Sequence, residues 1–476
     1  MSSFSEVSVY ANSFNLYENL LSPDTVSSIQ ESFSDFKLNF PHTVWHINST
    51  AKGGGVAEML RPLLSYCQDL AIPTRWAVIG GKPDFFAITK RIHNNIHGFM
   101  GDGESLGKRE RVHFEENALE NLSSLREIVP NDIIVLHDPQ TAALIPHLKK
   151  NGNKIVWRSH IGHEKPNHLS NRAWSFLKPY LEQADALVFS RREFVLPWME
   201  ADKIHIIPPS IDIFTPKNKE LTHTNSLNIL AHCGILRAPK EPSISAAQVH
   251  DTPNKMPAAL KRYADVLHCG PLPGAEDQII TQISRWDRLK DMVGVLRCFE
   301  DVISEDSSCY LILAGPTVHG VADDPEASLA FNECLDCWRN LPHFKRSRVQ
   351  LVCLPMTDID ENALIVNALQ RCSTVILQKS LYEGFGLTVT EAMWKQKVVV
   401  ASAVGGIKDQ IEDGITGRLI SDPGDLTTTG KAVLDLLKNQ GKREQIAAQA
   451  KEAITRRSLM PRHLQQYLTL FKKILE

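Results

Sequence analysis

Short apolar runs alternate with longer stretches of helical periodicity along most of the chain. Many of the runs are continuously apolar and rich in β-branched residues, which is typical of strands buried on both faces of a parallel sheet. Strands and helices that alternate in this way predict βαβ units. The predicted strands fall into two series, residues 43–47, 75–79, 133–137, 154–158, 186–189 and 204–207, then residues 279–284, 310–314, 349–354, 374–377 and 398–401. The pattern therefore predicts an α/β fold that is built twice.

A proline-rich stretch of weak periodicity separates the two series. It runs from residue 216 to about residue 275 and is predicted to be an insertion at the start of the second domain. At the end of the chain, Leu464, Tyr467, Leu468 and Phe471 recur at helical spacing. This terminal helix is expected to cross back to the first domain. The sequence therefore predicts an N-terminal domain of residues 1–215, a C-terminal domain of residues 216–460 and a terminal helix of residues 461–476.

Length and charge agree with two domains and exclude some partners. A chain of 476 residues exceeds what one hydrophobic core supports. Lys and Arg total 52 against 55 Asp and Glu, a net charge of −3, so no basic excess indicates nucleic acid. The sequence shows neither a secretory signal nor a run long enough to span a membrane. We therefore expect a cytoplasmic protein that binds neither nucleic acid nor a membrane.

The cysteine pattern argues against disulfides and against a metal centre. Nine cysteines are scattered through the chain, an odd number that fits reduced thiols. The close pair Cys334 and Cys337 has no second pair at zinc spacing, and a reduced helix face explains it better than a metal or redox role. No metal site is predicted.

Three consecutive glycines follow the first predicted strand. Gly53, Gly54 and Gly55 would let the backbone approach a ligand closely, and the helix that begins after them favours an anion. The loop matches neither the dinucleotide-binding fingerprint nor a Walker loop. A ligand loop and a simple tight turn both remain open on this evidence alone.

Polar residues also follow two later strands of the first series. Asp138 comes directly after one strand, and His160 follows the next. Ligands of open α/β sheets bind at the carboxyl ends of the strands, where these side chains could bind hydroxyls or hold a proton. Capping of the next element is the alternative. His160 to His163 also spells a signature of class I aminoacyl-tRNA synthetases, but its position in the chain is wrong for that motif.

The second series carries two candidate features at its strand ends. Arg285 and Lys290 follow the strand at residues 279–284, and a guanidinium with an ammonium can hold a diphosphate. Farther on, Glu383 and Glu391 flank a glycine-rich turn that leads into a helix. Two carboxylates in this setting can accept hydrogen bonds from the hydroxyls of two different sugars. If the two sheets face each other, the expected site is the cleft between the domains.

Together these motifs resemble the retaining glycosyltransferases of the GT-B fold, family 4. Within that family the sequence is most similar to the trehalose glycosyltransferring synthases, to which the trehalose phosphorylases are related. The resemblance covers residues 42–460 and rests on these motifs in order, with segments 207–212 and 404–407. It implies two Rossmann-like domains facing across a cleft, with donor binding in the second.

The resemblance also implies residue roles. Arg285 and Lys290 should hold the donor diphosphate, and Glu391 should bind the donor ribose. Asp138 and His160 should lie around the transferred sugar and the acceptor, so that Asp138, His160, Arg285, Lys290 and Glu383 form the catalytic set. The donor-binding set adds the first glycine loop and the loop that contacts the transferred glucose: Gly54, Gly55, Gly384, Phe385, Gly386, Leu387, Thr388 and Glu391.

The implied activity is transfer of glucose, with retention, from a nucleotide-diphosphate glucose such as UDP-glucose to a small sugar acceptor. Glucose as acceptor would give trehalose. The alternatives are a disaccharide phosphorylase, transfer to another small polyol or sugar, and a non-catalytic sensor of sugar nucleotides. No cofactor is implied, Mg²⁺ is not indicated, and the oligomeric state stays open with a homodimer among the options. The acceptor is the least determined part, because His160 is followed by Ile161-Gly162-His163 where the synthases carry Asp after Ile.

Overall fold

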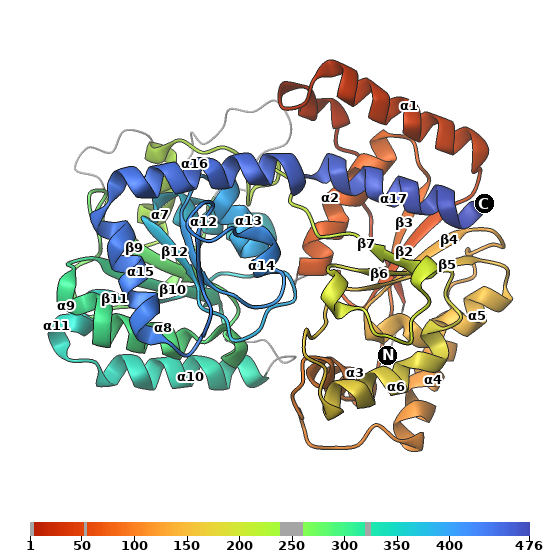
Figure 1. The fold of residues 1–476 in the computed structure, drawn as a ribbon, viewed down its shortest axis with the longest axis horizontal. Coiled ribbons are helices and arrows are strands. Elements are labelled where there is room, and N and C mark those ends of the chain that lie inside the picture. Colours follow the sequence, from red (N-terminus) through yellow and green to blue (C-terminus); the bar gives the residue numbers. More distant parts are fainter. Residues whose placement is uncertain (1–3, 52–54, 239–259, 319–324) are drawn as a thin grey trace. The chain divides into compact units, whose positions relative to one another are not determined.

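The computed structural model describes residues 4–51, 55–238, 260–318 and 325–476. The chain divides into two compact units (Figure 1). The N-terminal unit comprises Met1–Ser210 together with Ser458–Glu476, and the C-terminal unit comprises Ile211–Arg457. The terminal helix α17 (Met460–Leu475) therefore belongs to the N-terminal unit, as the sequence predicts. Each unit is described separately below.

The N-terminal unit is built on one mixed sheet. Its strand order among the described residues is β1-β3-β2-β4-β5-β6-β7, and all neighbours pair in parallel except β1, which is antiparallel to β3. The strands are β1 (Ser5–Glu6), β2 (Val44–Asn48), β3 (Thr74–Val78), β4 (Ile133–His137), β5 (Lys154–Ser159), β6 (Ala186–Phe189) and β7 (Ile204–Ile206). The parallel core explains the continuous apolar runs, since β2 and β4 are buried along their whole length.

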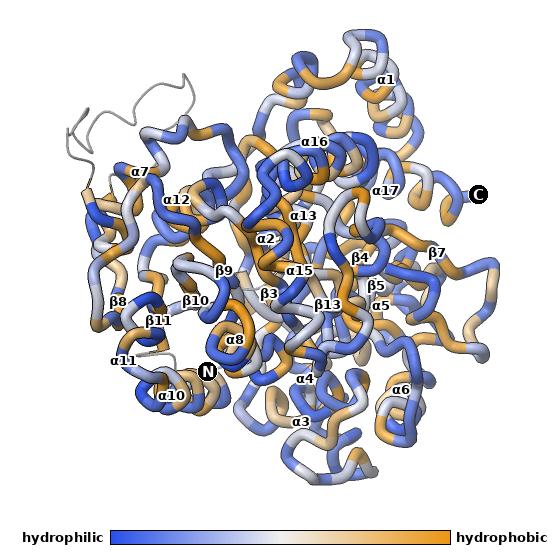
Figure 2. Tube along the Cα trace, turned by 60° about the vertical axis from the view of Figure 1, so that its left-hand side comes forward, coloured by the Kyte–Doolittle hydropathy of each residue, from blue (hydrophilic) through white to orange (hydrophobic). Residues whose placement is uncertain are grey.

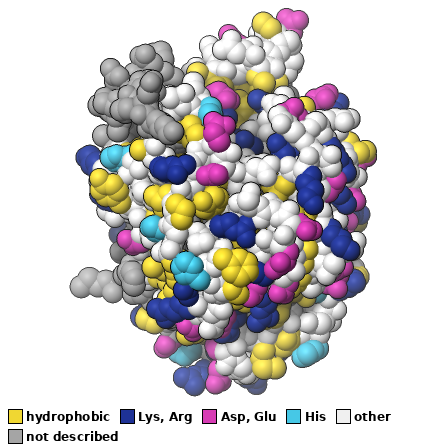
Figure 3. All heavy atoms as spheres, turned by 90° about the vertical axis from the view of Figure 1, so that its left-hand side faces the viewer, with side chains coloured by type: hydrophobic (Ala, Val, Ile, Leu, Met, Phe, Trp, Pro, Cys, Tyr) yellow, Lys and Arg dark blue, Asp and Glu magenta, His cyan; other side chains and the backbone are white. Residues whose placement is uncertain are grey.

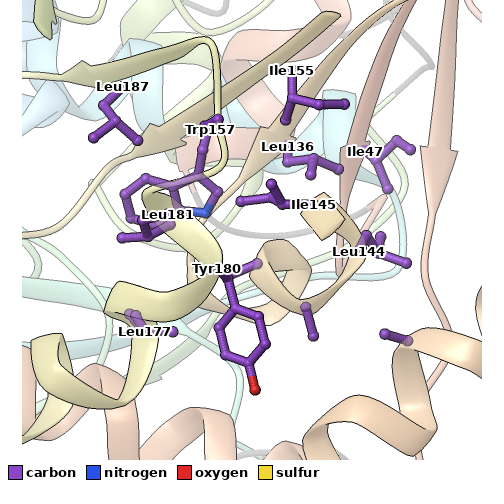
Figure 4. Close-up of a cluster of buried hydrophobic side chains, with 14 of the residues drawn as sticks. Ile47, Leu136, Leu144, Ile145, Ile155, Trp157, Leu177, Tyr180, Leu181 and Leu187 are labelled. Atoms are coloured by element: carbon purple, nitrogen blue, oxygen red, sulfur yellow. The ribbon is translucent and has the colours of Figure 1, made fainter. Parts of the chain in front are cut away.

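Helices cover both faces of this sheet. They are α1 (Pro23–Asn39), α2 (Gly55–Asp69), α3 (Pro83–Ile96), α4 (Lys108–Leu122), α5 (Ile145–Lys150), α6 (His168–Leu181) and α17. On the face under α3 to α6 the packing is apolar. Strand side chains there meet helix α6 and the start of α5 with the residue before it. Figure 4 shows Ile47, Leu136, Ile155, Trp157 and Leu187 beside Leu144, Ile145, Leu177, Tyr180 and Leu181.

The opposite face of the same sheet, called the polar face below, buries polar and charged side chains beside apolar ones. Side chains alternate between the faces along a strand, so the neighbours of Leu136 and Trp157 point away from the apolar cluster. These neighbours are His137 and Arg158, which are paired in register on β4 and β5. Both are almost completely buried, with exposed fractions of 1% and 0%. This face is covered by α2 and α17, which contact each other.

The C-terminal unit repeats the same design. Its strand order among the described residues is β14-β13-β12-β9-β10-β11-β8, parallel throughout except for the antiparallel edge strand β8. The strands are β8 (Asp265–Leu267), β9 (Ile279–Ile283), β10 (Tyr310–Pro316), β11 (Val349–Leu354), β12 (Val375–Gln378), β13 (Val399–Ser402) and β14 (Arg418–Ile420). Both units are thus Rossmann-like α/β sheets, as predicted.

Helices again flank the second sheet on both faces. They are α7 (His223–His232), α8 (Met292–Cys298), α9 (Ser304–Asp306), α10 (Pro325–Asn340), α11 (His343–Arg346), α12 (Ile359–Cys372), α13 (Leu387–Trp394), α14 (Ile407–Gln410), α15 (Leu426–Lys438) and α16 (Gln440–Arg457). One core lies under α8, α10 and α15 and a second under α7 and α12. In Figure 2 the buried helix α8 is largely orange, whereas α16 is largely blue.

Three short strands escape sequence prediction. β1 and β8 are antiparallel edge strands, and β14 is a parallel edge strand of only three residues. An edge strand is paired on one side only, so it needs no long apolar run and leaves little pattern. β8 lies inside the predicted insertion, of which residues 239–259 fall outside the described residues.

The surface agrees with the nearly neutral composition. On the face drawn in Figure 3, basic and acidic side chains are interspersed. All nine cysteines have free thiols. Within the described ranges, the helices are all too short or too polar to cross a lipid bilayer.

Candidate functional site

The first half-site lies in the C-terminal unit, where strand β9 ends. The following turn is held by two carboxylates of its own. Asp287 accepts a hydrogen bond from the amide of Leu289 at 2.8 Å, and Asp291, at φ 50°, accepts from the amide of Gly294 at 3.0 Å. Lys290 therefore lies at the end of a short 3₁₀ turn (Arg288–Lys290), just before α8 begins at Met292. This rigid turn fixes the backbone of Lys290.

Lys290 and Glu383 form the centre of this half-site. Lys290 Nζ lies 2.7 Å from Glu383 Oε1, and both side chains are mostly buried, with exposed fractions of 16% and 8%. The same carboxylate oxygen accepts from Ser380 Oγ at 2.9 Å and Gln378 Nε2 at 3.0 Å. Two features that the sequence places 93 positions apart are thus brought together at the ends of β9 and β12.

Arg285 behaves differently from Lys290. Its side chain is 52% exposed and pairs with Asp287 at 3.1 Å. A surface pair of this kind contributes little to stability and exchanges easily for another partner. The exposed guanidinium of Arg285 thus lies at the same strand end as Lys290.

The glycine turn after β12 packs directly against the loop after β13. The amide of Gly406 donates to Gly384 O at 3.1 Å. A Cβ atom on Gly405 would lie 1.8 Å from Glu383 O, and one on Gly406 would lie 2.7 Å from Phe385 Cα. Gly386, at φ 85°, then starts helix α13. The glycines permit this close approach of two backbones, and side chains of any size exclude it.

Glu391 lies on α13, just beyond that turn. It is 3% exposed, and its Oε1 lies 3.2 Å from Lys217 Nζ. Its Oε2 is buried with no hydrogen-bond partner among the described residues. A buried oxygen of this kind is costly unless a ligand satisfies it. One turn along the helix, burial lowers the pKa of Lys395 to about 7, although the nearby Glu391 opposes the shift.

The second half-site lies in the N-terminal unit, where strands β4 and β5 end. Asp138 Oδ1 accepts a hydrogen bond from the amide of His160 at 2.8 Å, so the structure brings these two predicted residues together. Asp138 has φ 63° and ψ 174°, a conformation that is strained for a residue with a side chain. Burial raises the pKa of Asp138 from its ordinary value near 3.8 to about 7, against the opposing effects of the His160 amide and Arg158.

A chain of imidazole rings runs back from His160 into the unit. His137 lies 3.0 Å from His160 through one ring nitrogen and 3.0 Å from His46 through the other. Burial, reinforced by the positive charge of Arg158, lowers the pKa of His46 to about 3. Burial also holds the pKa of His137 and that of His160 well below the ordinary range. His160 is therefore neutral at physiological pH.

Several residues of these half-sites are not indicated by sequence. Lys217 precedes α7 and reaches Glu391 from a distant part of the chain. Lys379, which pairs with Asp291 beneath the Lys290 turn, has no recognisable motif. His46 and His137 belong to predicted strands and carry no motif of their own. The one signal in the sequence is that a histidine stands in each of two otherwise apolar strands.

The predicted glycine loop of the N-terminal unit is mostly outside the described residues. Gly54 is outside the described residues, whereas Gly55 is the first residue of α2 and is exposed. No cluster of three or more His, Cys, Asp or Glu side chains suited to a metal ion occurs in the described part of the chain.

Comparison with known proteins assigns the family. The profile described as "Trehalose synthase, N-terminal domain" matches residues 46–196, and the profile of "Glycosyl transferases group 1" matches residues 357–453. The trehalose synthase of Pyrococcus horikoshii is 34% identical over 460 residues, which cover 96% of this chain and 95% of that protein. The chain belongs to the trehalose synthase family. It is therefore a glycosyltransferase, as the sequence motifs indicate.

More distant matches agree with this family. The trehalose phosphorylase of Pleurotus sajor-caju is 28% identical over 404 residues, which cover 79% of this chain and 50% of that protein. The crystal structure of Anabaena HepE in complex with UDP and glucose has a TM-score of 0.61 and 14% identity, and the match covers 91% of this chain and 100% of that one. The fold is that of the GT-B glycosyltransferases.

The two matched segments contain most, but not all, of the candidate site residues. The N-terminal profile includes Asp138 and His160, and the glycosyltransferase profile includes Glu383 and Glu391. Arg285 and Lys290 lie between the two matched segments. Their place in the half-site rests on the geometry described above.

Proposed function

We propose that this protein is a retaining glucosyltransferase that moves glucose from a nucleotide-diphosphate glucose to a small sugar acceptor, with glucose as acceptor giving trehalose. The observation that carries the proposal is Glu391, a buried carboxylate with one oxygen unpartnered among the described residues. The two hydroxyls of a ribose would satisfy that oxygen. Membership in the trehalose synthase family supports the identity of the product.

The geometry suggests how the donor is held. Lys290 and Arg285 would neutralise the diphosphate, one as a fixed, mostly buried ammonium and the other as an exposed guanidinium. Glu383 and the Gly384–Thr388 backbone would bind the transferred glucose, since Glu383 is already fixed by Lys290, Ser380 and Gln378. Asp138 and His160 would contact the sugars from the N-terminal unit.

The reaction would need no protein nucleophile. The bond between the anomeric carbon and the diphosphate oxygen breaks, and the acceptor oxygen forms a bond to the same face of that carbon. The leaving phosphate takes the acceptor proton, so the products are a nucleoside diphosphate and a disaccharide of retained configuration. Catalysis then depends on positioning and on stabilisation of the leaving charge. We propose that Lys290 and Arg285 supply that stabilisation without a metal.

A disaccharide phosphorylase is the second candidate. The match to a trehalose phosphorylase favours it, because inorganic phosphate could occupy the place proposed for the diphosphate beside Lys290. The two candidates differ in whether a nucleotide takes part.

One set of incubations separates the candidates. The protein is incubated with UDP-, ADP- or GDP-glucose, with and without glucose, and in parallel with trehalose plus phosphate. The proposal expects nucleoside diphosphate and α,α-trehalose, identified by proton NMR, only when donor and acceptor are both present, and the same rate in EDTA. Glucose 1-phosphate from trehalose and phosphate, without nucleotide, would instead establish a phosphorylase.

Variants test the observation that carries the proposal. Glu391→Gln keeps the shape of the side chain but removes the charge, and is expected to raise the KM for the donor about 10-fold or more. Glu412→Gln, an exposed glutamate of the same unit, is the control and should leave KM unchanged. An unchanged donor KM in Glu391→Gln would contradict the proposed ribose contact.

A further inference from the structure

Three imidazole rings cross the polar face of the N-terminal sheet. They come from β2, from the last residue of β4 and from the position just after β5, and the ring centroids are 5.3 Å apart at each step. The nitrogens in contact are His46 Nδ1 with His137 Nε2, and His137 Nδ1 with His160 Nε2, each at 3.0 Å. His137 is 1% exposed and uses both of its nitrogens in the chain.

The proton count makes this chain directional. A neutral imidazole carries one N–H, so His137 donates to one neighbour and accepts from the other. If His46 donates to His137, then His137 donates to His160, and the proton of His160 is left on Nδ1. If the chain runs the other way, Nδ1 of His160 carries only a lone pair. The state of His46 therefore sets the state of His160, which is partly exposed.

Burial, together with the positive charge of Arg158, keeps the three rings uncharged. The buried guanidinium of Arg158 donates to Tyr467 Oη at 2.6 Å, to His463 Nε2 at 3.1 Å and to Ile207 O at 3.1 Å. No carboxylate within the described ranges lies in ion-pair contact with it, so its positive charge opposes protonation of the rings. Because Arg158 can only donate, His463 must carry its proton on Nδ1, from which it donates to Ser210 Oγ at 2.8 Å.

The surroundings of His46, at the inner end of the row of imidazoles, determine the direction of the hydrogen bonds. His46 Nε2 makes no hydrogen bond in the described part of the molecule. The cavity beside this ring is mainly apolar, with a lining that includes Phe33, Phe36 and Leu63, and the Thr74 hydroxyl that also lines it forms no hydrogen bond with His46. A buried N–H without an acceptor is rarer than an unpaired acceptor. His46 is therefore expected to keep its proton on Nδ1, where His137 accepts it.

We propose that His46 and His137 are positioning residues that hold His160 in the single neutral tautomer with its proton on Nδ1. His160 then presents a fixed hydrogen-bond donor at the carboxyl end of the sheet. This part of the inference rests on the proposed function, in which the donor meets a sugar hydroxyl oxygen. The tautomer itself does not depend on that function.

The tautomer is measured directly in the full-length protein. Nitrogen-15 labelled histidine and two-bond nitrogen–proton correlations distinguish Nδ1–H from Nε2–H, and the His160 signals are assigned by their loss in His160→Gln. The expected result is Nδ1–H in the wild type. An Nε2–H tautomer at His160, or an equal mixture, overturns the proposal whether or not the protein transfers glucose.

Variants of His46 test the coupling. His46→Phe removes the donor and should give His160 a mixture of tautomers, whereas His46→Asn can still donate to His137 and should restore Nδ1–H. In the transfer assay, kcat should fall about 10-fold or more in His46→Phe at unchanged donor KM, and recover in His46→Asn. His205→Phe, on β7 of the same sheet, is the control. If His46→Phe leaves the tautomer of His160 unchanged, the rings are not coupled.

Discussion

At the residue scale, the two half-sites treat charge in opposite ways. In the C-terminal unit, the side chains of Lys290 and Glu383 form an ion pair at 2.7 Å. In the N-terminal unit, burial suppresses charge: the pKa of Asp138 is raised to about 7, and that of His46 is lowered to about 3. One half-site is thus suited to a charged ligand, and the other to neutral hydroxyl groups.

Asp138 makes stability depend on pH. Its folded-state pKa of about 7 lies above the unfolded value near 3.8, so its contribution is complete below pH 4 and is lost as the pH rises through 7. Asp138→Asn cannot ionise and should remove this loss. Urea denaturation at pH 5 and pH 8 should show the wild type falling by roughly 1–3 kcal/mol more than the variant between the two values. Equal pH dependence in both proteins would show that Asp138 ionises normally.

Lys290 and Arg285 should differ in their effect on stability. Lys290→Ala leaves the mostly buried Glu383 without its cation, which should lower the free energy of unfolding by about 3 kcal/mol. Arg285→Ala acts at a half-exposed side chain paired on the surface and should change the free energy of unfolding by less than about 0.5 kcal/mol. Both should abolish transfer if they hold the diphosphate. Denaturant titrations measure the change in stability, and the transfer assay measures the change in activity. An active Arg285→Ala enzyme would refute the proposed role of Arg285 in holding the diphosphate.

At the element scale, the site depends on two loops whose backbones touch. The turn after β12 carries Glu383, and the loop after β13 carries Gly405, where a Cβ would lie 1.8 Å from Glu383 O. Gly405 also has φ 50°. The position of the glutamate is therefore set by a neighbouring loop as well as by its own turn.

Gly405→Ala is expected to displace the Glu383 turn. Donor affinity should fall at least 10-fold by calorimetry, and the free energy of unfolding should fall by more than about 2 kcal/mol, since the clash adds to backbone strain. Gly414→Ala is the matched control: it has φ 77° but no atom within 4 Å of the added Cβ. It should cost only about 1 kcal/mol and leave affinity intact. Equal losses in both variants would mean that strain, not contact between the loops, dominates.

At the scale of the whole molecule, the chain leaves the N-terminal unit after Ser210 and returns at Ser458. The returning helix α17 covers the polar face of the N-terminal sheet and supplies His463 and Tyr467 to Arg158. The first unit is therefore complete only when the last residues of the chain have been made.

Ending the chain at Arg457 should unfold the N-terminal unit. The deletion removes seven buried apolar side chains at about 2 kcal/mol each, a sum comparable to the stability of a domain: Leu459, Met460, Leu464, Tyr467, Leu468, Leu470 and Phe471. Limited proteolysis should then digest residues 1–210 and spare the C-terminal unit. Ending the chain at Lys473 is the control and should leave both units resistant. Survival of residues 1–210 in the shorter chain would contradict this account.

Much of the fold can be read from the sequence, because parallel strands buried on both faces leave continuous apolar runs. The long strands β4, β5 and β11 are of this kind. Edge strands such as β8 pair on one side only and leave no such signal. Among the site residues, Glu383 and Glu391 are marked by the glycines around them, because the close approach of two backbones restricts which residues fit.

The sequence by itself determined the two α/β units and the helix that closes the first one, and it marked Glu383 and Glu391 through the glycines around them. It could not determine which ionisable side chains are charged in the folded protein, since that depends on burial and on partners that are distant in the sequence. Only the tertiary structure showed that Lys290 pairs with Glu383, that Lys217 reaches Glu391, and that Arg158 lies buried beside His137. Local patterns specify elements because they act over a few residues. Protonation and positioning are decided by packing, which brings together side chains from every part of the unit.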